Sequence, residues 1–244
     1  MGKASREKRD RVPVVVKKDR SLFPVVITSI IVAACLAITA VVVIGNGKAG
    51  EPAPAPSSDV TVPADLATSI DSETGAVVLG SVDNTLEEYI DFGCPYCGAY
   101  YQEFGDQIKQ FVADGDLTLK IYPLGMLDNQ FQGTEYSTRS ANSLYCVAEN
   151  APNSVFDYVG ALYANQPSEG STGLDDDTLI RIANEAGAGA AESCITDGTY
   201  NDFVGERTKE TLSNPDFKGT PYIKLNGELI DTGKVIGAIT ATIE

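Results

Sequence analysis

The chain has 244 residues, 43% of them hydrophobic, no histidine and a formal net charge of −16. That length fits one ordinary domain with appended segments. Residues 1–21 hold eight Lys and Arg against three acids, a net +5, whereas the remaining residues hold ten against thirty-one, a net −21. Phosphate groups would repel the acidic part, which argues against nucleic acid and anionic lipid surfaces as its partners.

Residues 22–44 form an apolar segment of twenty-three residues directly after the basic tail. At about 1.5 Å per residue, a helix of this length crosses a hydrocarbon core of about 30 Å. The positive-inside rule would keep the basic residues in the cytoplasm. We therefore expect residues 1–21 to be a cytoplasmic tail, residues 22–44 to be a single transmembrane anchor, and the rest to be extracytoplasmic.

Two other fates of this segment place the following residues outside the cytoplasm as well. Val32–Cys35 resembles a bacterial lipobox, in which Cys35 would be lipidated and become the mature N-terminus. The apolar run continues through Leu36–Ile44, which a lipoprotein does not need, so the uncleaved anchor is favoured. Cleavage as an ordinary signal peptide is disfavoured, because the run exceeds about 15 residues and no small-x-small site follows it.

Residues 45–73 are expected to be a Pro/Ala-rich linker, followed by one folded domain over residues 74–244. The segment Glu51–Ser58 alternates Pro with Ala and lacks the apolar content to pack. In the domain, the pattern predicts a first strand at a sheet edge, a second strand, an amphipathic helix and a third strand. Their ranges are Gly75–Ser81, Glu87–Phe92, Gly98–Val112 and Leu117–Tyr122.

A strand, a helix and a strand in this order predict a βαβ unit with parallel strands. Residues 134–213 are predicted to be helical in four pieces, 134–149, 154–164, 175–186 and 201–212. After them, Asn226–Gly227 predicts a type I′ hairpin between Tyr222–Leu225 and Glu228–Ile230, and a helix is predicted over Lys234–Thr242. The fold class is α/β, with βαβ and ββα halves and a helical insert over about 124–214.

The sequence Cys94-Pro95-Tyr96-Cys97 lies where the second strand gives way to the helix. On the first helical turn, unpaired N–H groups and the positive end of the helix dipole stabilise a thiolate, and the second sulfur can close a disulfide with the first. Pro95 suits the first helical position. The spacing therefore predicts thiol–disulfide exchange at Cys94 and Cys97.

Two plainer interpretations of the motif are weaker. A structural zinc site needs four nitrogen or sulfur ligands, but the chain has no histidine and only one Cys-x-x-Cys. A structural disulfide over two residues would constrain the unfolded chain very little.

Cys146 and Cys194 are the other cysteines of the domain. Four cysteines allow three connectivities. We favour Cys94 with Cys97 and Cys146 with Cys194, because this separates a reactive local pair from a bridge that closes a long loop, and because disulfides persist outside the cytoplasm. The alternative is that Cys146 and Cys194 are two unrelated buried thiols.

The order of elements, the Cys94–Cys97 motif and Gly219-Thr220-Pro221 before the hairpin resemble the thioredoxin superfamily, specifically the DsbA-like disulfide oxidoreductases. The resemblance covers residues from about 74 to the end. It implies that Thr220-Pro221 is a cis-proline loop, which faces the redox pair and offers backbone hydrogen bonds to a substrate strand. By sequence alone, Pro221 could equally be a trans proline that starts a strand.

Glu88, six residues before Cys94, matches the position of a buried acid in thioredoxin-like proteins. Its side chain would lie on the same face of the strand as those of Ile90 and Phe92. Burial there would raise its pKa and let it relay protons to Cys97. The alternative is that Glu87 or Asp91 faces inward and Glu88 is solvated.

Tyr96 departs from the histidine that DsbA proteins often carry between the cysteines, and a neutral tyrosine cannot stabilise the Cys94 thiolate by charge. The same Pro-Tyr dipeptide occurs in glutaredoxins, which are more reducing than the strongest DsbA oxidants. The direction of electron flow is therefore open at this point.

From the resemblance we expect an extracytoplasmic thiol:disulfide oxidase that forms disulfides in exported proteins. Its implied partners are unfolded exported proteins with reduced cysteines and a membrane quinone-linked reoxidant of the DsbB or vitamin K epoxide reductase type. We expect a monomer that needs no cofactor or metal. The alternatives are an extracytoplasmic disulfide reductase fed by a membrane electron carrier, and a non-catalytic peptide-binding chaperone module.

Overall fold

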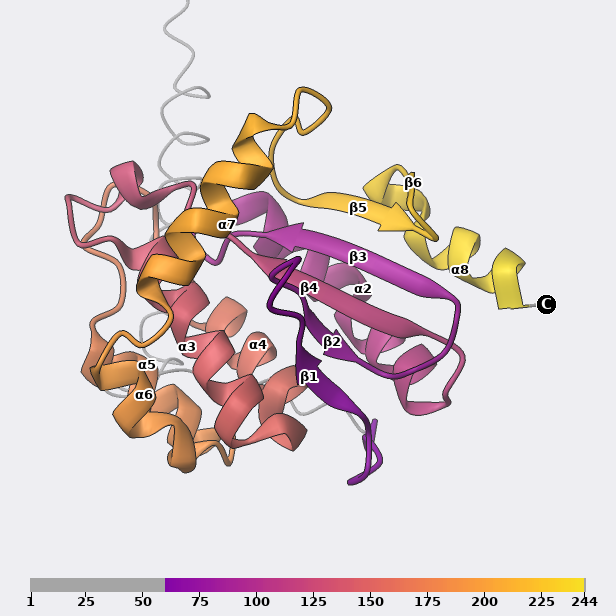
Figure 1. The fold of residues 1–244 in the computed structure, drawn as a ribbon, viewed down its shortest axis with the longest axis horizontal. Coiled ribbons are helices and arrows are strands. Elements are labelled where there is room, and N and C mark those ends of the chain that lie inside the picture. The colour runs from indigo at the N-terminus through magenta and orange to yellow at the C-terminus, as the bar shows by residue number, and fades with distance from the viewer. Residues whose placement is uncertain (1–59, 244) are drawn as a thin grey trace, which may run out of the picture. The chain divides into compact units, whose positions relative to one another are not determined.

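The computed structural model describes residues 60–243, which form a six-stranded mixed sheet with helices packed on it (Figure 1). The strand order is β1-β2-β4-β3-β5-β6, so the longest strands, β3 and β4, lie at the centre. The strands are β1 Thr68–Ile70, β2 Val77–Leu79, β3 Thr85–Ile90, β4 Thr118–Pro123, β5 Tyr222–Leu225 and β6 Glu228–Leu229.

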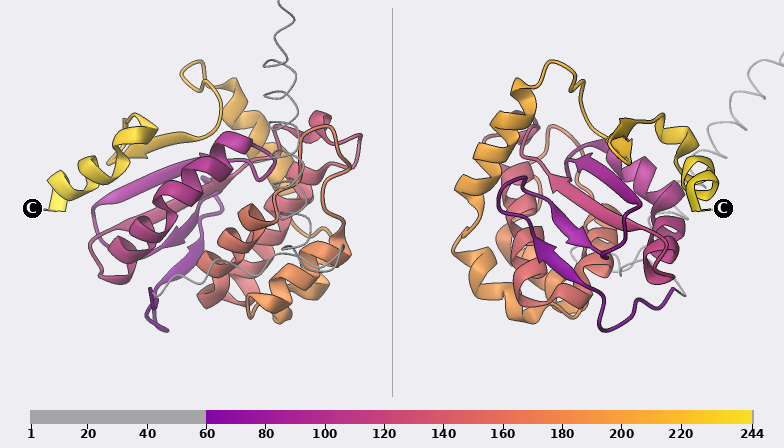
Figure 2. Two further views of the ribbon diagram at one scale, coloured as in Figure 1. Left: turned by 180° about the vertical axis from the view of Figure 1, so that it is seen from behind. Right: turned by 45° about the vertical axis from the view of Figure 1, so that its right-hand side comes forward.

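The predicted βαβ unit is confirmed as β3, α2 (Pro95–Ala113) and β4. β3 and β4 pair in parallel, with Glu88 opposite Ile121, and all other strand pairs in the sheet are antiparallel. The view from behind in Figure 2 shows α2 lying across one face of the sheet. Buried side chains of α2, including Tyr100 and Ile108, pack there because apolar residues recur at helical spacing.

The helical insert lies between β4 and β5, as predicted, and is organised around the buried helix α3. α3 packs against α4, α5, α6 and α7. A disulfide between Cys146 of α3 and Cys194 of α6 joins two segments 48 residues apart, which is the pairing favoured from the sequence. The helices are α3 Tyr136–Asn150, α4 Val155–Ala164, α5 Asp176–Glu185, α6 Glu192–Thr196 and α7 Asn201–Ser213.

The predicted hairpin and last helix are confirmed at the C-terminal end of the domain. Asn226 and Gly227 both have positive φ values, 51° and 83°, as a type I′ turn requires. Asn226 also accepts a hydrogen bond from the backbone N–H of Thr85 through its side chain, so the turn is tied to the start of β3. The chain then ends in α8, Val235–Ile243.

The start of the domain differs from the prediction. β1 (Thr68–Ile70) lies inside the range expected to be linker, so the strand expected at the sheet edge is β2, which lies between β1 and β4. Three residues of mixed polarity are too few to show the alternation that predicts a strand. The basic tail, the apolar segment with Cys35 and most of the linker lie outside the described residues. Within residues 60–243, no helix has both the length and the apolar composition to span a membrane.

Candidate active site

The two cysteines of the motif lie at the N-terminus of α2, directly after the central strand β3. Cys94 is the N-cap residue with extended backbone, Pro95 is the first helical residue, and Cys97 lies in the first turn. The N–H groups of Cys97 and Gly98 both donate to the carbonyl of Cys94 at 3.1 Å. Both thiols are free, so the pair is in its reduced form; Cys94 is 4% exposed and Cys97 is fully buried.

The environments of the two sulfurs push their pKa values in opposite directions. A hydrogen bond from Cys97, with smaller contributions from Thr220 and the N–H groups at positions 96 and 97, lowers the pKa of Cys94 to about 6. Burial, the hydrogen bond to Cys94 and the charge of Cys94 raise the pKa of Cys97 well above its ordinary value. At neutral pH, Cys94 is therefore a thiolate and Cys97 a thiol, which is the asymmetry that directed exchange needs.

The predicted loop at Pro221 lies beside Cys94. The Thr220–Pro221 peptide bond is cis, and the Cys94 sulfur lies 3.4 Å from the Thr220 carbonyl oxygen. The Thr220 hydroxyl lies 3.8 Å from the sulfur of Met126, so the loop after β4 also reaches this point. Tyr96 is 75% exposed, so its side chain extends from the site into solvent.

Glu88 is buried on the face of β3 that α2 covers. It is 5% exposed, and the Tyr100 hydroxyl donates to one of its carboxyl oxygens at 2.8 Å. Burial raises the pKa of Glu88 from 4.5 to about 7, and the hydrogen bond from Tyr100 opposes this only in part. Glu87, considered as the inward-facing alternative, lies on the opposite face of the strand.

Asp91 is a second buried acid, which the sequence interpretation treated only as an alternative to Glu88. Its carboxyl group accepts hydrogen bonds from the backbone N–H groups of Gly93 and Leu127, at 2.8 and 3.0 Å, and from the Ser137 hydroxyl at 2.7 Å. Burial raises its pKa to about 7. Asp91 thus joins the turn before Cys94 to the loop after β4 and to α3. Its position between the apolar Ile90 and Phe92 was the available sequence signal.

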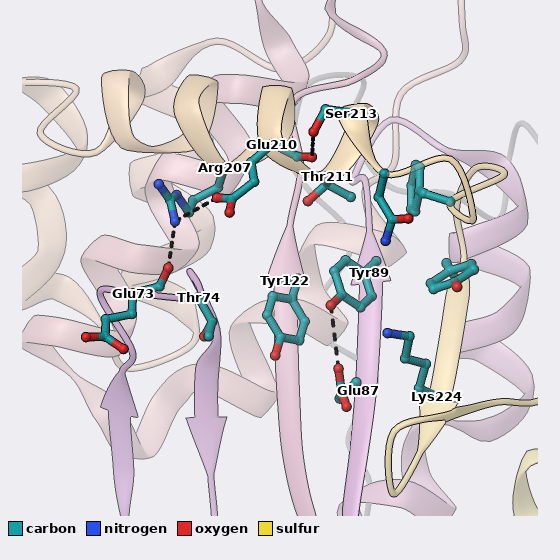
Figure 3. A pocket seen from close by; sticks show the side chains of 13 residues that line it. Glu73, Thr74, Glu87, Tyr89, Tyr122, Arg207, Glu210, Thr211, Ser213 and Lys224 are labelled. Atoms are coloured by element: carbon teal, nitrogen blue, oxygen red, sulfur yellow. Dashed lines mark hydrogen bonds and ion pairs between the residues drawn. The ribbon is translucent and has the colours of Figure 1, made fainter.

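A pocket of about 530 Å³ lies on the other face of β3 and contains none of the predicted site residues (Figure 3). The rings of Tyr89 and Tyr122 stack there with centroids 4.2 Å apart, below Arg207 and Glu210 of α7. Alternate residues of a strand face opposite sides of the sheet, so Tyr89 lines this pocket while Glu88 faces α2. The pocket and the redox pair therefore lie on different sides of β3. We therefore assign the chemistry to the α2 side of the sheet.

Glu88→Gln is expected to flatten the dependence of stability on pH. A carboxyl whose pKa is higher in the folded than in the unfolded state stabilises the fold below the unfolded pKa, and this stabilisation is lost as pH rises through about 7. The loss of unfolding free energy of the reduced protein between pH 4 and pH 8 should therefore be about 3 kcal/mol smaller in the variant. Urea unfolding at the two pH values measures this. Equal losses in both proteins would contradict a raised pKa at Glu88.

Comparisons with known proteins agree with this geometry. The family described as Thioredoxin matches residues 73–244. The serine/threonine-protein kinase PknE of Mycobacterium tuberculosis is 32% identical over 149 residues, which are 57% of this chain. The chain spans about a quarter of the length of the curated relatives it matches, 26% of each.

Solved structures of thiol–disulfide oxidoreductases share the fold. Oxidised DsbA of M. tuberculosis is 25% identical, with a TM-score of 0.58 over 69% of this chain and 100% of its own. Reduced DsbG of the same organism is 25% identical, with a TM-score of 0.60 over 74% of this chain and 85% of its own. MdbA of Corynebacterium matruchotii is 22% identical, with a TM-score of 0.62 over 74% and 92%. With the family match over residues 73–244 and a reactive cysteine pair beside a cis-proline, the chain belongs to the thioredoxin family and has a DsbA-like fold.

Proposed function

We propose that the protein is a thiol:disulfide oxidase that forms disulfides in exported proteins outside the cytoplasm. The observation that carries the proposal is the asymmetry of the pair: Cys94 lies at the N-terminus of α2 with a lowered pKa, whereas Cys97 is a buried thiol with a raised pKa. The DsbA and DsbG structures that share this fold support the reaction class. The apolar segment at residues 22–44 and the disulfide between Cys146 and Cys194 support the location.

In the proposed reaction, a substrate thiolate attacks the Cys94 sulfur of a Cys94–Cys97 disulfide. Cys97 leaves as a thiolate and takes up a proton, for which Glu88 is the proposed relay, and a mixed disulfide remains at Cys94. A second substrate thiolate then attacks the substrate sulfur of this mixed disulfide, so the substrate disulfide forms and Cys94 leaves as a thiolate. Two electrons stay on the pair. The low pKa of Cys94 makes it a good leaving group.

Turnover needs an acceptor for these two electrons. We propose a membrane quinone-linked partner of the DsbB or vitamin K epoxide reductase type, because the anchor expected at residues 22–44 would hold the domain at the membrane. The electron donors would be unfolded exported proteins with reduced cysteines. The proposed chemistry uses the cysteines themselves and no organic cofactor or metal.

A reductase that runs in the opposite direction is the second candidate, and Tyr96 is the observation that favours it. A neutral tyrosine lies where a histidine would add positive charge beside Cys94. Trapping of thiols in intact cells distinguishes the two directions. A largely oxidised Cys94–Cys97 pair supports the oxidase, and a largely reduced pair would reject it.

Tyr96→His is expected to make the protein more oxidising. Position 96 is exposed and adjacent to Cys94, so a protonated imidazole would stabilise the thiolate and the reduced form. The pKa of Cys94 should fall by up to about one unit, since solvent screens the charge. Titration of the thiolate absorbance and equilibration in a glutathione buffer measure the two effects. Tyr96→Phe is the control, and an unchanged titration in Tyr96→His would show that position 96 does not tune Cys94.

A further inference from the structure

Gln166 reaches the redox turn from the helical insert. It lies two residues after the end of α4, and its side-chain nitrogen is 2.8 Å from the Phe92 carbonyl oxygen and 2.9 Å from the Cys94 carbonyl oxygen. A carboxamide nitrogen carries two hydrogens. Both hydrogens are therefore donated to the segment that leads β3 into α2, more than seventy residues away in sequence.

The two carbonyl groups that accept these hydrogen bonds belong to Phe92 and Cys94, the residues on either side of Gly93. The Cys94 carbonyl is also the first acceptor of α2, because it receives the N–H groups of Cys97 and Gly98. Its orientation follows the backbone angles of Cys94, φ −80° and ψ 116°, and the next residue, Pro95, has no N–H with which to fix the turn. A side-chain donor at this point therefore restrains the peptide group that carries the reactive thiol into the helix.

A second, independent observation places the same amide against α2. A Cβ atom added to Gly98 would lie 2.5 Å from the side-chain oxygen of Gln166 and 3.2 Å from its carbonyl carbon. Glycine inside a helix is destabilising relative to alanine. The glycine after Cys97 leaves the space that the Gln166 amide occupies.

We propose that Gln166 is a positioning residue of the redox site, whose amide restrains the peptide groups around Gly93 so that the Cys94 sulfur stays against the N–H groups of the first turn of α2. Without it, the turn can rotate away from the N–H groups at positions 96 and 97. The thiolate would then lose part of its stabilisation while the fold of the insert persists. The inference rests on Cys94 being the reactive thiol of the proposed function.

The test compares Gln166→Ala with wild type in the full-length reduced protein. The thiolate titration of Cys94 should shift to higher pH, and its alkylation rate at pH 6 should fall about three- to tenfold, since a shift of one pKa unit changes the thiolate fraction up to tenfold. Gln110→Ala is the matched control, because the Gln110 side chain bonds Asp114 at the other end of α2. The control should leave both measurements unchanged. If the thiolate titration and the alkylation rate of Gln166→Ala equal those of wild type, the proposal is overturned.

Gly98→Ala provides a test that does not depend on Gln166→Ala being well folded, because alanine favours the helix. In wild type the new methyl group should displace the amide and reproduce the slower alkylation. In the Gln166→Ala background it should add no further loss. Additive losses in the double variant would contradict a shared contact. If wild-type Cys94 is not the rapidly alkylated thiol, the proposed function fails first; if it is, unchanged variants reject only the role of Gln166.

Discussion

Cys94→Ser should abolish thiol–disulfide exchange, with a loss of roughly a thousandfold or more in the oxidation of a reduced two-cysteine peptide. The remaining thiol, Cys97, is fully buried and its pKa is raised, so it is neither accessible nor ionised at neutral pH. Serine has nearly the size of cysteine, so the fold should persist. Peptide oxidation followed by mass spectrometry, with a glutathione buffer as the oxidant, measures the loss.

Cys97→Ser is the informative partner of this variant. Cys94 keeps its position against Thr220 but has no resolving thiol, so incubation with an oxidised peptide should leave a stable mixed disulfide at Cys94. The same pair of variants tests the non-catalytic alternative. Full activity of both variants in cells would favour a peptide-binding chaperone module over an enzyme.

Removal of the Cys146–Cys194 disulfide should lower the free energy of unfolding by about 4 kcal/mol, the value that chain entropy gives for a loop of this length. The bridge ties α3 to α6, a helix of only five residues with little buried surface of its own. The double variant Cys146→Ala/Cys194→Ala avoids a free buried thiol. Denaturant unfolding of this variant and of wild type measures the difference.

Exchange at the redox pair should survive in this double variant at temperatures where it is folded. The disulfide joins helices of the insert, whereas Cys94 and Cys97 lie at the start of α2. Loss of exchange in a variant with native circular dichroism would show that the bridge also supports the site. A stability change below about 1 kcal/mol would contradict its structural role.

The central part of the fold was predictable because its signals are local. Period-two alternation marks β4, helical spacing of apolar residues marks α2, and Asn226–Gly227 marks the hairpin. β1 and α6 were not predicted, because segments of three and five residues are too short for a period of 2 or 3.6 residues to repeat. Their structure depends on partners: β1 pairs with β2, and α6 is held by Cys194.

The sequence predicted only those residues of the candidate site whose role can be recognised from their neighbours in the chain. The Cys94–Cys97 spacing and the charge of Glu88 in an apolar strand are such signals. Asp91 was ambiguous, because strand alternation places it opposite Glu88, and both are buried only because the chain turns after Ile90. Gln166 gave no signal. Its neutral amide donates hydrogen bonds to backbone carbonyl groups. Every residue has such a carbonyl, so the residue types that Gln166 contacts do not reveal the interaction.

The two buried carboxyls have a consequence for how this chemistry can be observed. Among the described side chains, those with a pKa placed near neutrality are Glu88 and Asp91, at about 7, and Cys94, at about 6. The chain has no histidine to add a background of its own. A calorimetric or potentiometric titration of unlabelled protein between pH 5 and pH 8 can therefore count the protons that accompany the two electrons without a contribution from imidazole groups.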